Sequence, residues 1–447
     1  MALKQTTSKS VATKEKSFNL LKSVVRLVPG CLDGQSSVVV NNVQKALAGV
    51  SSTSSGSGTT PLLIAVLAFL GAFVETHPAR IYANSLPQLV DATVTFMGDK
   101  YQRVSLEALG TAASLAKALR PITSTASTSP LPSGYTAPVQ KLYEAVCEII
   151  SGPAADADVR DKALYAIGDL LTHEGEVLAP LYNKSLPLIS ARLNTDSNQL
   201  AALSVIENVA ESNACSGSYM EEWLASVLEQ LAGLLRRCSK QNRGKALAVL
   251  ETLLNRYLIS VYKDRRRRGL PTCILFRFGD GIPDNVGSAI VTELKTYINV
   301  QDLHNLGLTM HIVAQMQSTL GSLQIPVQAE IMPVVKEVIQ SPLLHAVALE
   351  GIQEFFAAYS RQTKGSADKL VPELFQLLVR PGATIPTAED GGTQAFANVA
   401  KCIGTVVENS HVQATSVVDD FIKSVKVRKE LCFSSDSVQR RLTPGSD

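Results

Sequence analysis

The sequence predicts an all-α protein, an α-solenoid in which helix pairs stack into a superhelix. Apolar residues recur at helical spacing in segment after segment of the chain. The helical segments themselves repeat about every 40 residues, a period that is typical of helical repeat arrays. Hydrophobic residues make up 45% of the chain but aromatic residues only 5%. This composition suits helices packed closely against helices better than it suits a β-sandwich.

The clearest predicted helix lies within residues 156–175, DADVRDKALYAIGDLLTHEG. Its apolar residues recur at spacings of three and four and form one face: Val159, Ala163, Ala166, Ile167, Leu170 and Leu171. Asp156 or Asp158 can cap the start of this helix, because an aspartate there accepts free backbone N–H groups. Gly175 is placed to end it, and residues 176–193 predict a second helix directly afterwards.

The same two-helix unit recurs along the chain. The first helices of the units are predicted to begin near residues 14, 61, 100, 158, 197, 241, 302, 342 and 393. Several second helices carry a proline at a matching place, where it fits the first helical turn: Pro87, Pro187, Pro333 and Pro372. Residues 99–115 and 156–171 resemble HEAT repeats, with an aspartate, a Val-Arg or Arg-Val pair and then small residues. The predicted solenoid is therefore built of HEAT-like helix pairs and is armadillo-like.

One array accounts for most of the chain. Residues 14–426 are predicted to form the solenoid, after a disordered N-terminus over residues 1–13 and before an irregular tail over residues 427–447. Loops are expected to interrupt the array at residues 50–60, 122–138, 263–284 and 380–393. The loops at residues 50–60, 122–138 and 380–393 are recognised by their serine, threonine, glycine and proline content. The loop at residues 263–284 differs from them in composition.

Residues 263–284 differ from the helical sequence on either side of them. They contain four consecutive arginines (Arg265–Arg268), break the helical period at Pro271 and Pro283, and include the apolar run CILFRF. We expect this stretch to be poorly ordered and to project from the array. A lineage-specific loop and translated intron sequence both fit it, and the abrupt end of the chain in RRLTPGSD favours the second interpretation. A nuclear-localisation role for Arg265–Arg268 stays open.

Charge and cysteine usage exclude several classes of function. The 42 basic and 40 acidic side chains nearly cancel, so the chain as a whole does not attract nucleic acid or acidic lipid. The cysteines contain no C-x-x-C pair and mostly lie in apolar helical contexts: Cys31, Cys147, Cys215, Cys238, Cys273, Cys402 and Cys432. We expect reduced, buried thiols in an intracellular protein. The apolar run over residues 61–74 is too short to cross a bilayer and predicts a buried core helix.

No catalytic, cofactor-binding or metal-binding residue is predicted, and the protein is expected not to be an enzyme. GSGTT over residues 56–60 lacks the lysine of a P-loop. His304 and His311 share a predicted helix but lie seven residues apart, too far to bind one zinc ion, and His345 lacks the second histidine of a zinc motif. Trp223 is predicted to pack at a helix–helix seam, with an exposed partner anchor as the alternative. The partner-binding residues stay unknown at this point.

Five fragments carry a resemblance to a known family. In order along the chain they are FNLLKSVVRLVPGCL (18–32), GDKYQRVSLEALGTAASLAKALRP (98–121), SPLLHAVALEGIQEFF (341–356), AKCIGTVV (400–407) and DFIKSVK (420–426). They resemble the central HEAT repeats of the cullin-associated, neddylation-dissociated protein family, also known as the TATA-binding-protein-interacting proteins. Their collinear order is the stronger argument, because single HEAT repeats look alike.

The resemblance implies a non-enzymatic scaffold without a cofactor. Members of this family are superhelices that wrap a cullin–RING ubiquitin ligase core when the cullin lacks its ubiquitin-like modifier, and they exchange its substrate receptors. The implied partners are the cullin and its RING subunit, with the TATA-binding protein implied by the second family name, in the cytoplasm and nucleus. Family members are much longer than this chain, so weak cullin binding and little adaptor displacement are expected of it.

Another HEAT-repeat scaffold and a nucleic-acid-binding protein are the alternatives to this function. The alternative HEAT-repeat function is that of an importin-β-like transport receptor. Such receptors typically carry an acidic inner surface, whereas this near-neutral chain shows no acidic run. Nucleic-acid binding would need basic residues spread along one face, whereas Arg265–Arg268 form one short cluster, so nucleic acid is disfavoured as a partner. No membrane partner is expected.

Overall fold

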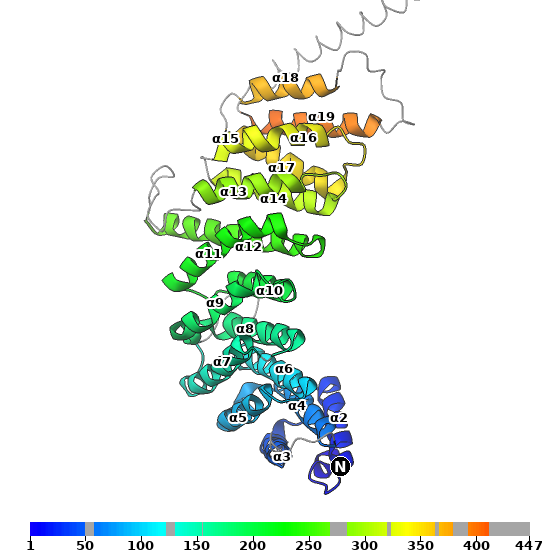
Figure 1. Ribbon diagram of the computed structural model, residues 1–447, viewed down its shortest axis with the longest axis vertical. Coiled ribbons are helices and arrows are strands. Elements are labelled where there is room, and N and C mark those ends of the chain that lie inside the picture. The colour runs from blue at the N-terminus through cyan, green and yellow to red at the C-terminus, as the bar shows by residue number, and fades with distance from the viewer. Residues whose placement is uncertain are drawn as a thin grey trace, which may run out of the picture. The chain divides into compact units, whose positions relative to one another are not determined.

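The computed structural model describes residues 1–49, 58–121, 130–153, 155–268, 284–319, 323–362, 366–378 and 392–410. Within these ranges every regular element is a helix and none is a strand, which confirms the predicted all-α solenoid class (Figure 1). The chain forms two compact units. Unit 1 consists of residues 1–234 and 238–256, and unit 2 consists of residues 235–237 and 257–447.

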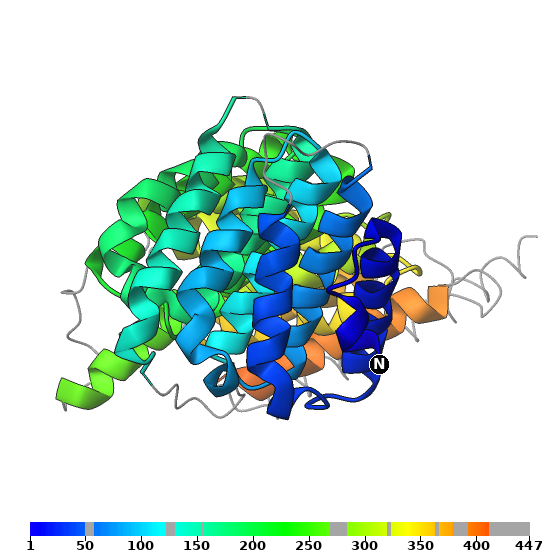
Figure 2. The ribbon, with the colours of Figure 1, turned by 90° about the horizontal axis from the view of Figure 1, so that it is seen from below.

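The helices of unit 1 lie in two rows. They are α1 (Ala2–Gln5), α2 (Val11–Leu27), α3 (Ser36–Ala48), α4 (Thr60–Thr76), α5 (Leu86–Met97), α6 (Gln102–Leu119), α7 (Thr136–Ser151), α8 (Ala157–Leu178), α9 (Tyr182–Arg192), α10 (Gln199–Glu211), most of α11 (Ser218–Arg237) and the first part of α12 (Lys240–Arg268). In the first row α2, α4, α6, α8 and α10 pack successively against one another. In the second row α3, α5, α7 and α9 do the same (Figure 1). Figure 2 shows this unit from below, with its blue N-terminal helices in front.

Unit 2 continues the same plan. Its helices are α13 (Asp284–Leu294), α14 (Leu303–Thr319), α15 (Gln324–Pro326), a π-helical turn (Val327–Ile331) that leads into α16 (Met332–Val338), α17 (Ala346–Gln362), α18 (Ser366–Leu378) and α19 (Gly392–Asn409). α14, α17 and α19 pack successively in a first row. α14 and α17 approach most closely at two glycines, because a Cβ placed on Gly351 would lie 2.5 Å from the carbonyl oxygen of Gly307. Glycine is therefore required at position 351 for these two helices to pack as they do.

The predicted positions of the first helices of the repeat units are confirmed. They begin at Val11, Thr60, Gln102, Ala157, Gln199, Lys240, Leu303, Ala346 and Gly392. The apolar run at residues 61–74 lies within α4 and forms part of the core, as predicted. There the ring centroids of Phe18 on α2 and Phe69 on α4 are 5.5 Å apart, and both side chains are almost fully buried.

The predicted pairing of helices is wrong by one helix. Several helices pack more closely against the first-row helix that follows them than against the one before them: α3, α5, α7, α9 and α18. For α5 and α7 the connections account for this pairing. Residues 98–101 join α5 to α6 and residues 152–156 join α7 to α8, whereas α6 and α7 are separated by residues 120–135. Short connections keep antiparallel neighbours together.

The N-terminus also differs from the prediction, because residues 1–13 are not disordered. They contain α1 and the start of α2, and two polar side chains hold them in place. The side-chain amide of Asn42 on α3 donates hydrogen bonds to the carbonyl oxygen of Leu3 (3.3 Å) and to Oγ1 of Thr6 (2.9 Å). Ser10 caps α2 by accepting a hydrogen bond from the backbone N–H of Thr13.

Two prolines and one glycine act differently from the prediction. Pro87 and Pro333 lie in first helical turns as predicted, but Pro187 and Pro372 lie inside α9 and α18, which begin earlier. α8 continues past Gly175 to Leu178, but only across a kink at Glu174 (φ −118°, ψ 18°), so its first helical segment ends one residue before the predicted glycine. A Cβ on Gly175 would lie 2.7 Å from the carbonyl oxygen of Ala214, so the close packing of the next repeat requires a glycine.

The predicted loop at 263–284 is shorter than expected at its start, because α12 continues through Lys263 to Arg268 without interruption. A helix forms there because Lys263 to Arg268 contain no glycine or proline, and lysine and arginine are good helix formers. Residues 269–283 lie outside the described residues, as do most of the other three predicted loops (50–57, 122–129 and 379–391) and the chain beyond residue 410, including the predicted tail at 427–447.

Ion pairs connect successive second-row helices of unit 1, and in unit 2 they connect α13, α16 and α18 or the turns next to them, which we count as the second row of that unit. In unit 1, Asp91 pairs with Lys141 and Glu144 with Lys184; in unit 2, Lys295 pairs with Glu330 and Lys336 with Glu373. Exposed pairs of this kind contribute about 0.2–1 kcal/mol each at most. We call these four pairs the second-row ladder.

Candidate protein-binding groove in unit 1

An open groove of about 640 Å³ runs across the first row of unit 1, and we call it the first-row groove. Its lining comes from five helices that are far apart in sequence, α2, α4, α6, α8 and α10. Its charged residues are Lys22, Arg26, Glu75, Glu107, Lys117, Lys162 and Asp169. The volume falls within the usual range for ligand sites, but the lining is polar and charged rather than apolar. The groove therefore suits a charged partner better than an apolar small molecule.

The floor of the groove is made of small side chains on the middle helices of the row: Ala68, Gly71, Ala72, Gly110, Thr111, Ala113, Ser114 and Ala166. These residues let the helices approach closely, since a Cβ on Gly71 would lie only 3.4 Å from Oγ of Ser114. The hydroxyl of Thr111 donates a hydrogen bond to the carbonyl oxygen of Leu67 (3.0 Å) and so joins α6 to α4. The result is a hollow with a floor of small residues, which the longer charged side chains also line.

Some charges of the groove are satisfied within the chain. Nζ of Lys117 lies 2.9 Å from a carboxylate oxygen of Asp169. The hydroxyl of Ser114 donates a 2.6 Å hydrogen bond to Glu75. Five charges are left, and none of them forms an ion pair with any other residue that the structure describes: Lys22, Arg26, Lys162, Glu75 and Glu107. The unpaired charge of the groove is therefore positive.

Tyr165 gives the groove an exposed aromatic side chain. It lies on α8 and is 40% exposed, while Ala166 beside it on the same helix is buried. Exposed tyrosines within concave surfaces are typical anchors for protein partners, because they offer a large rigid contact area and a hydroxyl. Helical periodicity predicted the apolar face of this helix correctly but gave no sign that Tyr165 borders a groove.

A buried carboxyl group, that of Glu174, lies at the kink in α8. Glu174 is fully buried, and neither of its carboxyl oxygens accepts a hydrogen bond from a described residue. Burial raises the pKa of Glu174 well above its ordinary value, and the negative charge of Asp169, which lines the groove, contributes to raising it. The nearby guanidinium of Arg120 only partly opposes this rise. Arg120 instead donates 3.2 Å hydrogen bonds to the carbonyl oxygen of His173 and to the carboxylate of Glu176.

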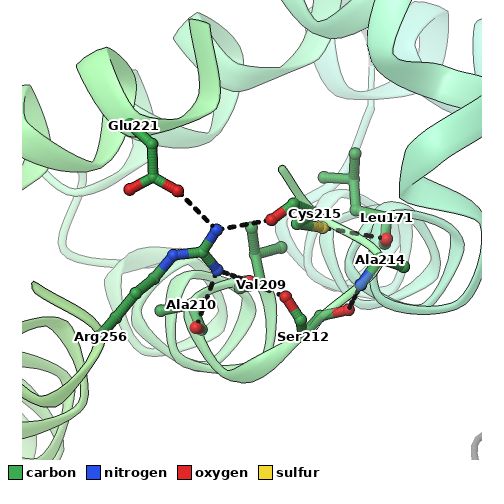
Figure 3. Close-up of polar contacts among 8 residues, drawn as sticks. All are labelled: Leu171, Val209, Ala210, Ser212, Ala214, Cys215, Glu221 and Arg256. Carbon is green, nitrogen blue, oxygen red and sulfur yellow. Dashed lines mark hydrogen bonds and ion pairs between the residues drawn. The ribbon is translucent and has the colours of Figure 1, made fainter. Parts of the chain in front are cut away.

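Arg256 holds the end of α10 and the turn that follows it (Figure 3). One terminal nitrogen of its guanidinium donates hydrogen bonds to three carbonyl oxygens, those of Val209 (3.2 Å), Ala210 (2.9 Å) and Ser212 (3.3 Å). The other terminal nitrogen donates to the carbonyl oxygen of Cys215 and, over 2.8 Å, to the carboxylate of Glu221. The carbonyl groups at a helix C-terminus lack helical partners and carry partial negative charge, so a cation is favourable there. We call this arrangement the Arg256 clasp.

Trp223, for which the sequence left open a packing role and a role as a partner anchor, is a packing residue. Trp223 is 7% exposed, and its indole N–H lies within hydrogen-bonding distance of the Leu186 carbonyl oxygen (3.0 Å) and of Oγ of Ser190 (2.6 Å). It therefore packs at the seam between α9 and α11, which confirms the first interpretation. The thiols of Cys147, Cys215, Cys238 and Cys402 are buried as predicted, whereas Cys31 is exposed.

The three histidines singled out in the sequence do not form a metal site within the described residues. His304 and His311 both lie on α14, where His311 contacts the carboxylate of Glu354, and His345 lies in the turn before α17. The described residues contain no cluster of three side chains placed to hold a metal ion. None of the helices in the described ranges is both long and apolar enough to span a membrane. The side chains of Arg265–Arg268 lie outside the described residues.

Comparison with known proteins agrees with the repeat architecture. Residues 30–167 match the family model described as CAND1-like, TPR repeats. The chain is 24% identical over 408 residues to the cullin-associated NEDD8-dissociated protein 1 of Arabidopsis thaliana, covering 90% of this chain and 30% of that protein. It is 22% identical over 435 residues to the protein of the same name in Drosophila melanogaster, covering 94% of this chain and 32% of that protein. It is also 25% identical to the cullin-associated NEDD8-dissociated protein 2 of Mus musculus, over 90% of this chain and 30% of that protein.

The similarity to solved structures is weaker. A designed armadillo repeat protein in complex with the peptide (KR)4 is 15% identical, with a TM-score of 0.38, over 56% of this chain and 98% of that chain. A TM-score at this level supports no conclusion. The chain spans about 30% of the length of the curated relatives it matches. Over nine-tenths of its length, this helical repeat chain is similar to the cullin-associated NEDD8-dissociated proteins, which confirms the resemblance seen in the sequence.

Proposed function

We propose that this chain is a non-enzymatic scaffold that binds cullin–RING ubiquitin ligase cores whose cullin carries no NEDD8. The observation that carries the proposal is the similarity to cullin-associated NEDD8-dissociated proteins over 90% of the chain. A helical repeat array supports it, because such arrays offer extended surfaces to protein partners. Contact with the RING subunit belongs to the same proposal, and only a small part in substrate-receptor exchange is expected of this chain.

The first-row groove is the candidate contact surface for the cullin. It crosses five helices of one row, and its floor of small residues leaves room for a partner segment. Its charges and Tyr165 supply the polar and aromatic contacts that protein interfaces use. A partner that lies along the row can contact several repeats at once.

We expect this chain to bind more weakly than its longer relatives. It spans about 30% of their length, so it can contact only part of an elongated partner. Contacts that are linked along one chain multiply affinity by about 10²–10⁴, and that gain falls when part of the contacts is missing. For the same reason this chain is expected to displace little adaptor from a cullin.

The test measures binding of the full chain to immobilised cullin–RING cores by biolayer interferometry, with one core unmodified and one modified by NEDD8. We expect a Kd at the micromolar end of the range for protein interfaces with the unmodified core, and binding at least about tenfold weaker with the modified one. A fluorescent adaptor already bound to the cullin is expected to stay there. Equal affinity for both cores, or no binding to either, would refute the proposal.

A further inference from the structure

We propose that the first-row groove recognises an extended, carboxylate-rich segment of a protein partner. This inference rests on the proposed function only in taking the groove as a protein-binding surface, and it does not depend on which protein binds. It concerns the charges left over once the groove's internal contacts have been counted. Those charges determine which kind of segment the groove can accept.

The unpaired cations lie on both sides of the groove. Lys22 and Arg26 are one helical turn apart on α2, at one end of the row, and Lys162 is on α8, beyond the floor formed by α4 and α6. Lys162 also reaches over the floor, since a Cβ on Gly110 of α6 would lie 3.5 Å from its Cε and 3.8 Å from its Nζ. A segment that crosses the floor would therefore have a cation at each side.

The carboxylates of the groove do not cancel these cations. Asp169 is paired with Lys117, and Glu75 accepts the hydrogen bond of Ser114. Neither Glu75 nor Glu107 has a cation as partner among the described residues, so three unpaired cations face two unpaired anions and one positive charge is left over. Lys22 and Lys162 are both half-buried, and a charge with part of its water removed interacts more strongly with an opposite charge than a fully hydrated one does.

The surroundings favour a protein segment over a nucleic acid. Three carboxylates lie among the cations of the lining, and they would repel the continuous row of phosphates of a nucleic acid. An acidic peptide carries its carboxylates on separate side chains, which can contact the cations and avoid the carboxylates of the groove. The glycine and alanine floor lets an extended backbone lie close to the helices. Tyr165, 40% exposed, offers one aromatic contact beside Lys162, whereas single-stranded nucleic acids are held by a series of stacking aromatics.

The experiment uses the full chain and fluorescence anisotropy. The probe is a short fluorescein-labelled peptide of alternating glutamate and alanine, compared with the same peptide carrying lysine in place of glutamate and with a single-stranded oligonucleotide. The acidic peptide is expected to bind and the basic one not. Lys22→Glu and Lys162→Glu are each expected to weaken binding about three- to tenfold, and Glu107→Gln to strengthen it about twofold.

Lys45→Glu is the matched control, because Lys45 is an exposed lysine on α3, outside the groove lining, and the substitution changes the net charge of the chain equally. Circular dichroism checks that each variant is folded, and Glu107→Gln keeps the test decisive if a reversal variant does not fold. Equal binding of both peptides, tighter binding of the oligonucleotide, or an equal loss with Lys45→Glu would overturn the inference. If the acidic peptide binds in the groove but no cullin core does, the proposed function fails and this inference stands.

Discussion

Replacing Arg256 with methionine is expected to destabilise unit 1 by about 3 kcal/mol. The substitution keeps an unbranched apolar stem but removes the guanidinium that forms the Arg256 clasp. Four backbone carbonyl oxygens, from Val209 to Cys215, then lose the guanidinium as a donor, although that of Val209 still accepts from the backbone N–H of Ser212. The end of α10 also loses the cation that balances its partial negative charge.

The magnitude follows from how the contacts are shared. A hydrogen bond to a charged group contributes about 1.5–3 kcal/mol, but one nitrogen of Arg256 divides its donors among three carbonyl oxygens, so each terminal nitrogen counts for about 1.5 kcal/mol. The Arg256 side chain is only 15% exposed, so water replaces these contacts poorly. The carboxylate of Glu221 is on a side chain that is 44% exposed, and its ion pair therefore contributes less than about 1 kcal/mol.

Urea unfolding followed by tryptophan fluorescence measures this effect locally, because Trp223 is the single tryptophan of the chain and is buried in unit 1. With a slope of about 3 kcal/mol per molar urea, the midpoint is expected to fall by about 1 M. Glu221→Gln is the control and should lower the midpoint by less than about a third of that. An unchanged midpoint for Arg256→Met, or equal losses in the two variants, would show that the clasp does not hold this turn.

Two further substitutions test the packing described above. Because burial raises the pKa of Glu174 above its ordinary 4.5, the folded carboxyl keeps its proton while the unfolded one ionises, so unit 1 should lose stability as pH rises from 4.5 to the raised pKa. Glu174→Gln should remove this loss in urea midpoints measured across that range, and a parallel pH dependence in both proteins would contradict the assignment. Gly351→Ala should destabilise unit 2 by about 2 kcal/mol or more in thermal unfolding, since its Cβ would meet the carbonyl oxygen of Gly307. Gly404→Ala, on α19 with open space around the added Cβ, should instead stabilise it by about 0.5–1 kcal/mol, and equal effects of the two would refute the close-approach argument.

Helical periodicity was sufficient to predict the row of first helices. The apolar face around Ala163, Ile167 and Leu170 is continuous in the sequence and buried in the fold, so local pattern and tertiary packing agree. The N-terminus was predicted wrongly because its polar groups form hydrogen bonds with a residue that is distant in sequence. Asn42 lies 36 residues beyond Thr6, whose hydroxyl it binds, and no local pattern shows such a pairing. The helix pairing failed for a related reason, since repeat spacing alone does not say which neighbour a helix packs against.

The groove could not have been predicted as a site from the sequence. Lys22 and Lys162 are ordinary polar positions of two amphipathic helices, with no motif around either. The stacking of α2, α4, α6 and α8 brings these two lysines to one hollow. In the sequence, the small residues of the floor cannot be distinguished from those of an ordinary close contact between helices. Which charges are left unpaired depends on side-chain geometry such as the 2.9 Å contact of Lys117 with Asp169.

The second-row ladder differs in direction between the two units. In unit 1 the carboxylate is on the earlier helix and the lysine on the later one, as in Asp91 with Lys141. In unit 2 the order is reversed, as in Lys295 with Glu330. A second-row helix of one unit that stacked in the other would place like charges opposite each other. Repeat proteins are prone to such misassembly during folding, so these weak pairs can discriminate among similar helices while adding little to the stability of the finished array.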